Sequence, residues 1–396
     1  LVKQATHREP LLKQLQQPTT FYIGFDATAD SLHVGHLLPI MVMAHFRLGG
    51  HDPIALVGGG TTMIGDPTGK SEMRQMMSAE IIAAYAQAIG AQINDILATV
   101  PGPKVTMVNN ADWLLKLNYI DVLRDIGVHF SVNRMLTYDC FTTRMERGLS
   151  FIEFNYMILQ SYDFLTLFRN FGCKLQVGGD DQWSNIISGV DLVRRMEQAE
   201  VYGLTIPLLE TADGNKMGKT EAGAVWLSAE HTSPYEFFQY WRNSHDQDVN
   251  RFLKMYTFLP VAEIDELTAK EGQEINASKE RLAFEVTKLV HGEEEAVKAR
   301  QAARALFAGG NQQGAIPSTL VNRQRLEAGI NVIDLMVECG LVQSKSEGRR
   351  VIQQGGLTVN EERIGDIELM VDGSFLMGDR IALRKGKKSH HHVLVE

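Results

Sequence analysis

Two histidines, three residues apart, form the first pattern in this sequence that could do chemistry. His33 and His36 follow a short apolar stretch, 21–25, and they open a segment, 35–48, whose spacing predicts a helix ending before Gly49. Free backbone N–H groups and the positive end of the dipole make a helix start attractive to anions. Because residues three apart share a helix face, both imidazoles could face one anion. A metal pair is disfavoured, because no third ligand with suitable spacing appears.

Three polar side chains share one face of a second predicted helix, 151–171. Tyr156, Gln160 and Asp163 stand at i, i+4 and i+7 among mostly apolar neighbours. Polar groups on a largely buried helix need hydrogen-bond partners. The row therefore predicts a polar ligand site, and a solvent-facing stripe is the alternative that the pattern leaves open.

Several polar loops follow predicted strands. A glycine-rich loop, 58–70, follows the strand 53–57, but it is not a P-loop because only three residues separate Gly65 from Gly69. An acidic turn with Asp180 and Asp181 follows the strand 174–177. The carboxyl ends of parallel strands are where open α/β sheets bind ligands. A flexible connection and a helix cap, respectively, remain the alternatives for these two loops. A further loop, 211–220, carries two lysines that could simply be solvated.

The elements that must position these residues alternate between strand and helix. Strands at 21–25, 53–57, 105–108 and 174–177 and helices at 35–48, 71–97, 151–171 and 184–195 predict an α/β, Rossmann-like catalytic domain with a parallel sheet covered on both faces. From 233 to about 307 the pattern is helical, and a glycine- and glutamine-rich stretch then reads as a linker. We therefore predict four segments: the Rossmann-like domain 1–230, an α-helical domain 231–308, a linker 309–330 and a small α+β domain 331–396 that begins with a helix at 332–338.

Composition limits the classes of protein that the chain can belong to. The 396 residues are 44% apolar, which allows large cores, and no apolar run approaches membrane-spanning length. Three widely separated cysteines predict a reducing, cytoplasmic setting without disulfides. A net charge of −9 disfavours non-specific coating of nucleic acid but leaves room for a local basic patch. The predicted patch, for which a scattered charged surface is the alternative, comprises Lys345, Arg349, Arg350, Lys387 and Lys388.

Two short motifs connect these observations to a known family. The sequence HVGH at 33–36 is similar to the HIGH signature, and KMGKT at 216–220 is similar to the KMSKS signature. With them, nearly the whole chain resembles the bacterial-type tyrosyl-tRNA synthetases, which are class I aminoacyl-tRNA synthetases with an S4-like RNA-binding C-terminal domain. The resemblance implies activation of L-tyrosine by ATP to tyrosyl-adenylate and pyrophosphate, followed by transfer to the 3′ end of tRNA(Tyr). It implies Mg²⁺ with ATP as substrate and no tightly bound cofactor. It also implies a cytoplasmic homodimer, joined through 122–151, that binds no membrane, with 231–308 meeting the anticodon arm.

The same resemblance implies roles for individual residues. The catalytic group would be Thr28, His33, His36, Lys216, Lys219 and Thr220. Tyr22 and Asp163 would hydrogen-bond the phenol of the substrate, Asp66, Tyr156 and Gln160 would hold its ammonium group, and Gln182 would lie near its carboxylate. The ATP contacts would be Gly24, Asp26, His33, Gly35, His36, Gly179, Asp181 and Lys219, with His36 and Asp181 near the ribose.

The chain departs from the family pattern at a few positions, and three rival functions differ in what they require. Val34 replaces the isoleucine of HIGH, Gly218 and Thr220 replace the serines of KMSKS, and Asp180 adds a charge beside Asp181. A tryptophan-specific synthetase would not need both Tyr22 and Asp163 aimed at a phenol. A small-molecule nucleotidyltransferase could share HxGH but has no reason to carry an S4-like tail. An RNA-binding protein with an inactive synthetase-like part would bind RNA without tyrosine-dependent exchange.

Overall fold

The computed structural model describes residues 2–66, 77–146, 148–209, 211–212, 214, 217–220, 223–269, 272–307, 317–378, 380–386 and 389–395. The chain divides into two compact units, one of residues 1–228 and 250–261 and the other of residues 229–249 and 262–396. Within the described ranges, no helix is both long and apolar enough to cross a membrane.

The first unit is built on a six-stranded sheet of order β1-β6-β5-β2-β3-β4. Its strands are β1 (Gln4–Ala5), β2 (Thr20–Asp26), β3 (Asp52–Gly58), β4 (Thr106–Asn109), β5 (Leu175–Gly179) and β6 (Tyr202–Ile206). β2 to β6 are parallel, in agreement with the predicted parallel sheet, and only the short β1 runs antiparallel, at the edge beside β6. Buried apolar residues such as Phe21, Ile54 and Leu175 explain why these strands lie inside the unit.

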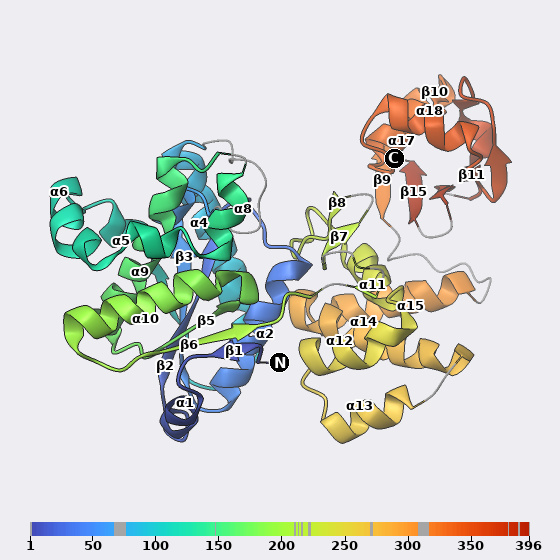
Figure 1. Cartoon of the computed structure of the whole chain (residues 1–396). Coiled ribbons are helices and arrows are strands. Elements are labelled where there is room, and N and C mark those ends of the chain that lie inside the picture. The colour runs from blue at the N-terminus through green and yellow to red at the C-terminus, as the bar shows by residue number, and fades with distance from the viewer. Residues whose placement is uncertain are drawn as a thin grey trace. The chain divides into compact units, whose positions relative to one another are not determined.

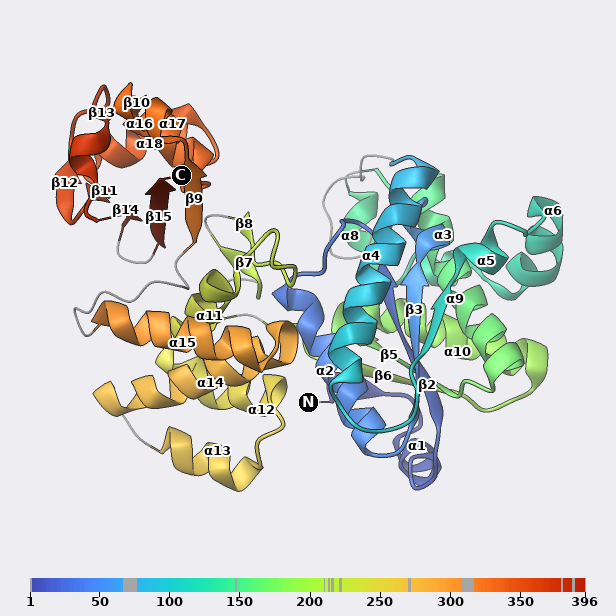
Figure 2. The same cartoon turned by 180° about the vertical axis from the view of Figure 1, so that it is seen from behind.

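Helices cover both faces of this sheet. α10 (Trp183–Glu197) contacts β5 and β6 and lies in front of the sheet in Figure 1. α4 (Ala79–Ala98) contacts β3 and lies in front in the reversed view of Figure 2, beside α2 (Val34–Leu48). The predicted helix 71–97 corresponds to α4, which begins at Ala79 because Ser78 caps its first turn. Residues 71–76 lie outside the described ranges. The doubly covered sheet confirms the predicted α/β class.

α9 spans Phe151–Phe171, the range that the sequence predicts. Ser150 and Glu153 form a capping box at its start, and Gly172, with a φ of 63°, ends it in the left-handed conformation. The remaining short elements of this unit are α1 (Arg8–Gln14), α3 (Gly59–Thr62), α5 (Ala111–Leu114), α6 (Tyr119–Asp121), α7 (Val132–Met135), α8 (Asp139–Met145), β7 (Lys219–Thr220), β8 (Gly223–Ala224) and most of α12 (Val249–Tyr256).

The second unit begins with a helical part. Ser233 and Glu236 form a capping box, and Pro234 occupies the first helical position, where its missing N–H is tolerated. The helices are α11 (Pro234–Arg242), α13 (Val261–Thr268), α14 (Ile275–His291) and α15 (Glu293–Phe307). These elements agree with the helical pattern from residue 233 onward.

The C-terminal part is a small α+β fold with a core of its own. A five-stranded sheet of order β12-β11-β14-β15-β9 and a strand pair, β10 with β13, accompany three helices. The core residues run from Val321 to Val393. The elements are β9 (Ser318–Val321), α16 (Arg323–Glu327), β10 (Ile330–Asn331), α17 (Val332–Glu338), α18 (Lys345–Gln353), β11 (Leu357–Val359), β12 (Glu362–Ile364), β13 (Met370–Val371), β14 (Arg380–Lys385) and β15 (Ser389–Val395).

The predicted linker 309–330 is wrong over its second half. β9 pairs in parallel with β15, and Val321 is fully buried, so residues 318–330 belong to the C-terminal fold. A four-residue strand beside a glycine-rich stretch has too little pattern of its own to be recognised, and its pairing partner lies about 70 residues further along the chain. Residues 309–316 lie outside the described ranges.

Candidate active site

A cavity of about 300 Å³ lies in the first unit, at the carboxyl ends of the parallel strands. Its lining comes from β2 and the loop after it, α2, β3, α9, β5 and the turn that follows β5. This is the edge at which an open α/β sheet binds ligands. The sequence-predicted residues that line the cavity are Tyr22, Gly24, Asp26, Thr28, His36, Asp66, Tyr156, Gln160, Asp163, Gly179, Asp181 and Gln182.

A buried carboxyl group, that of Asp163, marks one end of the cavity. Its side chain accepts hydrogen bonds from Asn110 Nδ2 at 2.9 Å and from Trp113 Nε1 at 2.7 Å. Burial raises the pKa of Asp163 to about 7, although these two hydrogen bonds act in the opposite direction. Near neutral pH the group is therefore poised between its charged and neutral forms, and it can accept a further hydrogen bond from a ligand hydroxyl.

Three buried polar atoms around the cavity have no hydrogen-bond partner within the described part of the chain. They are the Tyr22 hydroxyl, Gln160 Oε1 and Gln176 Oε1, and all three residues line the cavity. An unsatisfied buried polar group costs about 1–3 kcal/mol. Three such atoms around one cavity indicate that it is built to take a polar ligand.

Tyr22 is held next to the carboxyl group of Asp163. Burial raises the pKa of Tyr22, and the negative charge of Asp163 raises it further, so its hydroxyl stays protonated. Gln176 on β5 stands opposite Tyr22 in the sheet register. Sequence reasoning gave no individual role in the site to Gln176, Asn110 or Trp113. Only the pairing of β2 with β5 brings Gln176 to the site, and only the fold of 110–113 over α9 brings the other two.

Polar contacts continue along the cavity from Asp26 to Gln182. Asp26 accepts hydrogen bonds from the Tyr156 hydroxyl at 3.1 Å and from Thr61 Oγ1 at 2.9 Å. Gln182 Nε2 donates to Asp66 Oδ2 at 2.8 Å. Burial first, and then the Asp26 charge, raise the pKa of Tyr156. These contacts gather two carboxylates and a phenol at the cavity wall, and such a set of groups can attract a ligand cation.

Close backbone approach explains one of the glycines at this edge. A Cβ atom at Gly179 would lie 2.4 Å from Asp181 Oδ1, so a larger residue there would displace the acidic side chain from the cavity wall. The aspartate that follows Gly179, Asp180, has a different position. Asp180 Oδ1 accepts hydrogen bonds from Gln4 Nε2 at 2.7 Å and from Thr205 Oγ1 at 2.8 Å. It joins β1 and β6 to the turn and is not part of the cavity lining.

The two histidines begin α2 with a reciprocal cap. Gly35 N–H donates to His33 Nδ1 at 3.0 Å, and His33 N–H donates to His36 Nδ1 at 3.2 Å. The two rings lie 4.0 Å apart between centroids. His36 lines the cavity, whereas His33 and Gly35 do not. Both imidazoles were expected to face one anion. The two rings are close together, but only His36 lies on the cavity wall.

The second motif meets the first through its glycine. Gly218 has a φ of 79°, and a Cβ atom there would lie 3.0 Å from the backbone nitrogen of Gly35. Val225 joins the two segments, since its N–H donates to the Gly218 carbonyl and its carbonyl accepts from the Val34 N–H, each at 2.9 Å. A left-handed backbone at a tight approach favours glycine over serine. Lys216 lies outside the described residues, and only the backbone of Lys219 and Thr220 is described, in β7.

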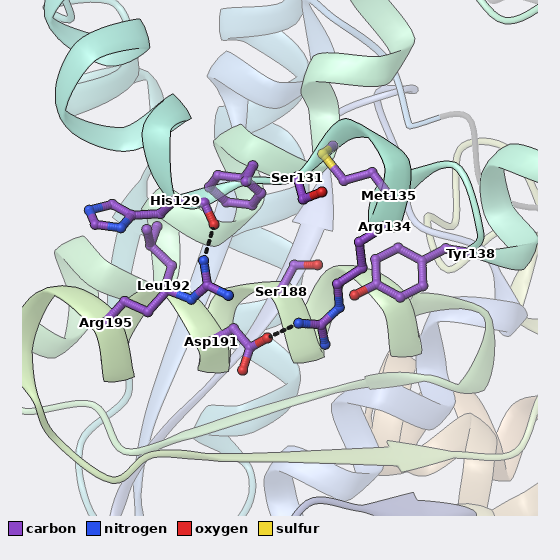
Figure 3. A pocket seen from close by; sticks show the side chains of 10 residues that line it. His129, Ser131, Arg134, Met135, Tyr138, Ser188, Asp191, Leu192 and Arg195 are labelled. Carbon is purple, nitrogen blue, oxygen red and sulfur yellow. Dashed lines mark hydrogen bonds and ion pairs between the residues drawn. The ribbon is translucent and has the colours of Figure 1, made fainter.

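A smaller pocket of about 40 Å³ lies between α7 and α10 (Figure 3). Its charged side chains are engaged with protein: Arg134 and Asp191 form an ion pair at 3.0 Å, and Arg195 Nη1 donates to the His129 carbonyl at 2.5 Å. A cavity of this volume has room for a few water molecules and is too small for an amino acid or a nucleotide. The cavity at the carboxyl edge of the sheet, which gathers the predicted residues and the buried polar atoms without partners, is therefore the candidate active site.

A Rossmann-like sheet with a polar cavity at its carboxyl edge, and with HVGH and KMGKT segments in contact beside it, defines a class I aminoacyl-tRNA synthetase. In agreement, residues 13–308 match the family described as tRNA synthetases class I (W and Y). Residues 312–393 match the tyrosine–tRNA ligase SYY-like C-terminal domain. The chain belongs to this class I family, and within it to the tyrosine–tRNA ligases.

Individual relatives support the same placement. A tyrosine–tRNA ligase of Acetivibrio thermocellus is 56% identical over 393 residues, which cover 99% of this chain and 96% of the relative. A tyrosine–tRNA ligase of Clostridium botulinum strain Loch Maree is 54% identical over 398 residues, which cover 100% and 97%. A solved C-terminally truncated mitochondrial tyrosyl-tRNA synthetase of Aspergillus nidulans has a TM-score of 0.70 at 32% identity, covering 78% of this chain and 91% of that one.

A tryptophan-specific relative shares the fold as well. A tryptophanyl-tRNA synthetase of Encephalitozoon cuniculi bound to tryptophan has a TM-score of 0.55 at 13% identity, covering 76% of this chain and 85% of that one. The fold alone therefore does not choose between the two amino acids, and the site must do so.

Proposed function

We propose that this chain makes tyrosyl-tRNA(Tyr) in the cavity at the carboxyl edge of its parallel sheet. The carboxylate of tyrosine attacks the α-phosphorus of ATP, the bond to the β-phosphate breaks, and pyrophosphate leaves. A hydroxyl of the terminal tRNA ribose then attacks the carbonyl carbon of the tyrosyl-adenylate, and AMP leaves. Because the substrate is itself the nucleophile, the protein supplies position and charge rather than a nucleophile.

The observation that carries this proposal is the presence of both Tyr22 and Asp163 at the buried end of the cavity, without a hydrogen bond between them. The Tyr22 hydroxyl has no hydrogen-bond partner among the described residues. The carboxylate of Asp163 accepts hydrogen bonds from Asn110 and Trp113, which hold it in place. A substrate phenol placed between them would donate to the carboxylate and accept from the Tyr22 hydroxyl. Phenylalanine would leave both groups unpaired, which is a strong basis for rejection.

The remaining site residues receive their roles from the chemistry around the phenol end. The ammonium group of tyrosine is assigned to Asp66, Tyr156 and Gln160. Asp66 is itself a carboxylate, and the Tyr156 hydroxyl is hydrogen-bonded to the carboxylate of Asp26. The amide oxygen of Gln160 has no hydrogen-bond partner among the described residues. Gln182 is assigned to the carboxylate region. Phosphate contacts and positive charge for the transition state are assigned to Thr28, His33, His36, Lys216, Lys219 and Thr220. The nucleotide is assigned to Gly24, Asp26, His33, Gly35, His36, Gly179, Asp181 and Lys219.

An exchange assay tests the proposed function. Incorporation of labelled pyrophosphate into ATP is expected to require L-tyrosine and to stop when Mg²⁺ is chelated, because Mg²⁺ accompanies ATP as a substrate complex. L-Tryptophan and L-phenylalanine serve as matched controls and are expected to support little exchange. Exchange driven equally well by tryptophan, or no exchange with any amino acid, would remove the proposal.

The later segments are assigned to tRNA, with the helical part meeting the anticodon arm and the C-terminal part binding RNA. Arg349 and Arg350 are exposed on α18, and Lys345 on the same helix is held by an ion pair with Asp334 at 2.6 Å. Lys387 and Lys388, which complete the proposed basic patch, lie outside the described residues.

The three cysteines agree with a cytoplasmic location. They are free thiols, as expected in a reducing cytoplasm: Cys140, Cys173 and Cys339. Recovery of the chain from a membrane fraction would contradict that location.

A homodimer joined through the segment 122–151 is also proposed. Large apolar side chains are exposed there, among them Val128 at 70% and Phe151 at 69%. Exposed apolar residues gathered in one segment are typical of an interface. The variant Phe151→Asp is expected to sediment as a monomer of 44.2 kDa, whereas the parent chain is expected at twice that mass. The new carboxylate should not harm folding, because Phe151 begins α9 and an acidic residue is favourable at a helix start.

The matched control for the dimer is Leu12→Asp, which changes an exposed apolar residue on α1. It should leave the dimer intact. A parent chain that sediments as a monomer, or a Phe151→Asp variant that stays dimeric, would contradict an interface at this segment.

A further inference from the structure

A second large cavity, of about 380 Å³, lies within the helical part of the second unit. It is formed by the end of α11 and by facing turns of α14 and α15. Four guanidinium groups line it, against a single carboxylate, that of Glu280. The four arginines are Arg242, Arg281, Arg300 and Arg304. We call this the arginine cavity.

The protein satisfies part of this positive charge. Arg304 Nε donates to Glu280 Oε1 at 2.9 Å, so the one lining carboxylate is already engaged. Arg281 pairs with Glu285 on its own helix at 2.9 Å. Arg242 Nη1 donates to the Ala303 carbonyl at 3.3 Å. Burial lowers the pKa of Arg242, the charge of Glu280 opposes that shift, and the charge of Arg304 adds a smaller lowering. Like charges held close together in a partly buried cavity favour the entry of an anion.

Arg300 is the arginine whose charge the protein leaves available. Its guanidinium lies over the ring of Phe284, 4.3 Å from the ring centroid. No ion pair to Arg300 occurs within the described residues. Stacking fixes the plane of the guanidinium and leaves the N–H groups along its edge able to donate. A planar fork held in this way suits the two oxygens of a phosphate group.

We propose that the arginine cavity binds the phosphodiester backbone of the tRNA substrate, with Arg300 as the principal contact. The inference rests on the proposed function, which supplies the polyanion, and adds a binding site made of residues other than those of the basic patch on α18. The phosphate–guanidinium contacts are independent of base sequence, so the cavity contributes affinity and register rather than choice of tRNA.

The variant Arg300→Gln tests the proposal in the full-length chain. It removes the charge and keeps a side chain that can cover Phe284. We expect the dissociation constant for tRNA to rise about five- to tenfold near 0.1 M salt, and the slope of log affinity against log salt to become shallower by about one. Tyrosine-dependent exchange should be unchanged, because the arginine cavity lies outside the unit that contains the active site.

Lys298→Gln is the matched control. Lys298 lies on the same helix as Arg300, and its variant removes the same single positive charge. Lys298 is exposed, forms ion pairs with Glu294 and Glu295, and does not line the arginine cavity. Its variant should bind tRNA within about twofold of the parent, with the salt slope nearly unchanged. Arg300→Lys keeps the charge and loses the fork, and it should restore most of the slope but only part of the affinity.

Parent-like affinity and slope in Arg300→Gln would overturn the arginine cavity as an RNA site. An equal loss in Arg300→Gln and Lys298→Gln would do the same, because it would reduce the effect to net charge. Failure of this site is distinguishable from failure of the proposed function. Absence of tyrosine-dependent exchange in the parent chain would contradict the proposed function. If the parent chain shows this exchange and binds tRNA, and Arg300→Gln binds tRNA as well as the parent does, only the arginine cavity as an RNA site is contradicted.

Discussion

Replacing Asp163 with alanine is expected to reduce the preference for tyrosine over phenylalanine by about 10- to 100-fold. A hydrogen bond to a buried charged group contributes about 1.5–3 kcal/mol, and the variant removes the carboxylate that distinguishes a phenol from a phenyl ring. Asp163 is 1% exposed, so its hydrogen bond to the phenol would be shielded from bulk solvent. The measurement is the ratio of kcat/KM values for the two amino acids in pyrophosphate exchange.

The design of this experiment must separate specificity from stability. Removing Asp163 also leaves Trp113 Nε1 without its acceptor, whereas Asn110 Nδ2 keeps its hydrogen bond to Thr61 Oγ1 at 3.0 Å, so the free energy of unfolding should fall by about 1–3 kcal/mol. The ratio of the kcat/KM values for tyrosine and phenylalanine does not depend on that loss, because both values are measured on the same folded enzyme. Ser161→Ala is a suitable control, because Ser161 is buried on the same helix but donates only to the Met157 carbonyl. An unchanged ratio in Asp163→Ala would show that the phenol lies elsewhere.

Removing residues 312–396 should lower kcat/KM for tRNA charging by at least about 100-fold while leaving tyrosine-dependent exchange within about twofold of the parent chain. Simultaneous removal of several phosphate-binding side chains reduces nucleic-acid affinity by orders of magnitude. The chemistry of adenylate formation should survive, since the candidate active site and the C-terminal part lie in different units. The core of the C-terminal part draws only on residues from Val321 onward, so its removal exposes no shared core.

The structure decides where this truncation must begin. A cut near residue 330, which the sequence pattern alone would suggest, would leave β9 without β15 and would expose the unpaired edge of a strand. The double variant Arg349→Gln with Arg350→Gln keeps the fold and should reproduce part of the loss through a weaker affinity for tRNA. Full charging activity in the truncated chain would mean that the C-terminal part serves another purpose.

Much of the architecture could be predicted from the sequence because it follows from local patterns. α9 and α17 begin and end at the predicted residues, since their caps and apolar spacing lie within the segments themselves. The parallel class of the main sheet follows from the alternation of strands and helices. Short elements that depend on a distant partner, such as β1, β6 and β9, were not predicted, because their own residues carry too little periodicity.

The candidate site divides in the same way. The sequence alone was enough to select Tyr22, Asp163 and the two motifs, because their residue types and spacing resemble those of one family. The tertiary structure decided which groups support them, because it brings Asn110 and Gln176 to the cavity wall and Trp113 to the carboxylate of Asp163.

Tertiary structure also decided the meaning of two departures from the family pattern. Gly218 occupies a left-handed, closely packed position against Gly35, which a serine would strain. Asp180 does not line the cavity, and its Oδ1 atom accepts hydrogen bonds from Gln4 and Thr205. Residue type and spacing determine which chemistry a chain can perform. Contacts between segments far apart in sequence determine how each group is oriented, satisfied and charged, because those contacts arise only when the sheet and its helices assemble.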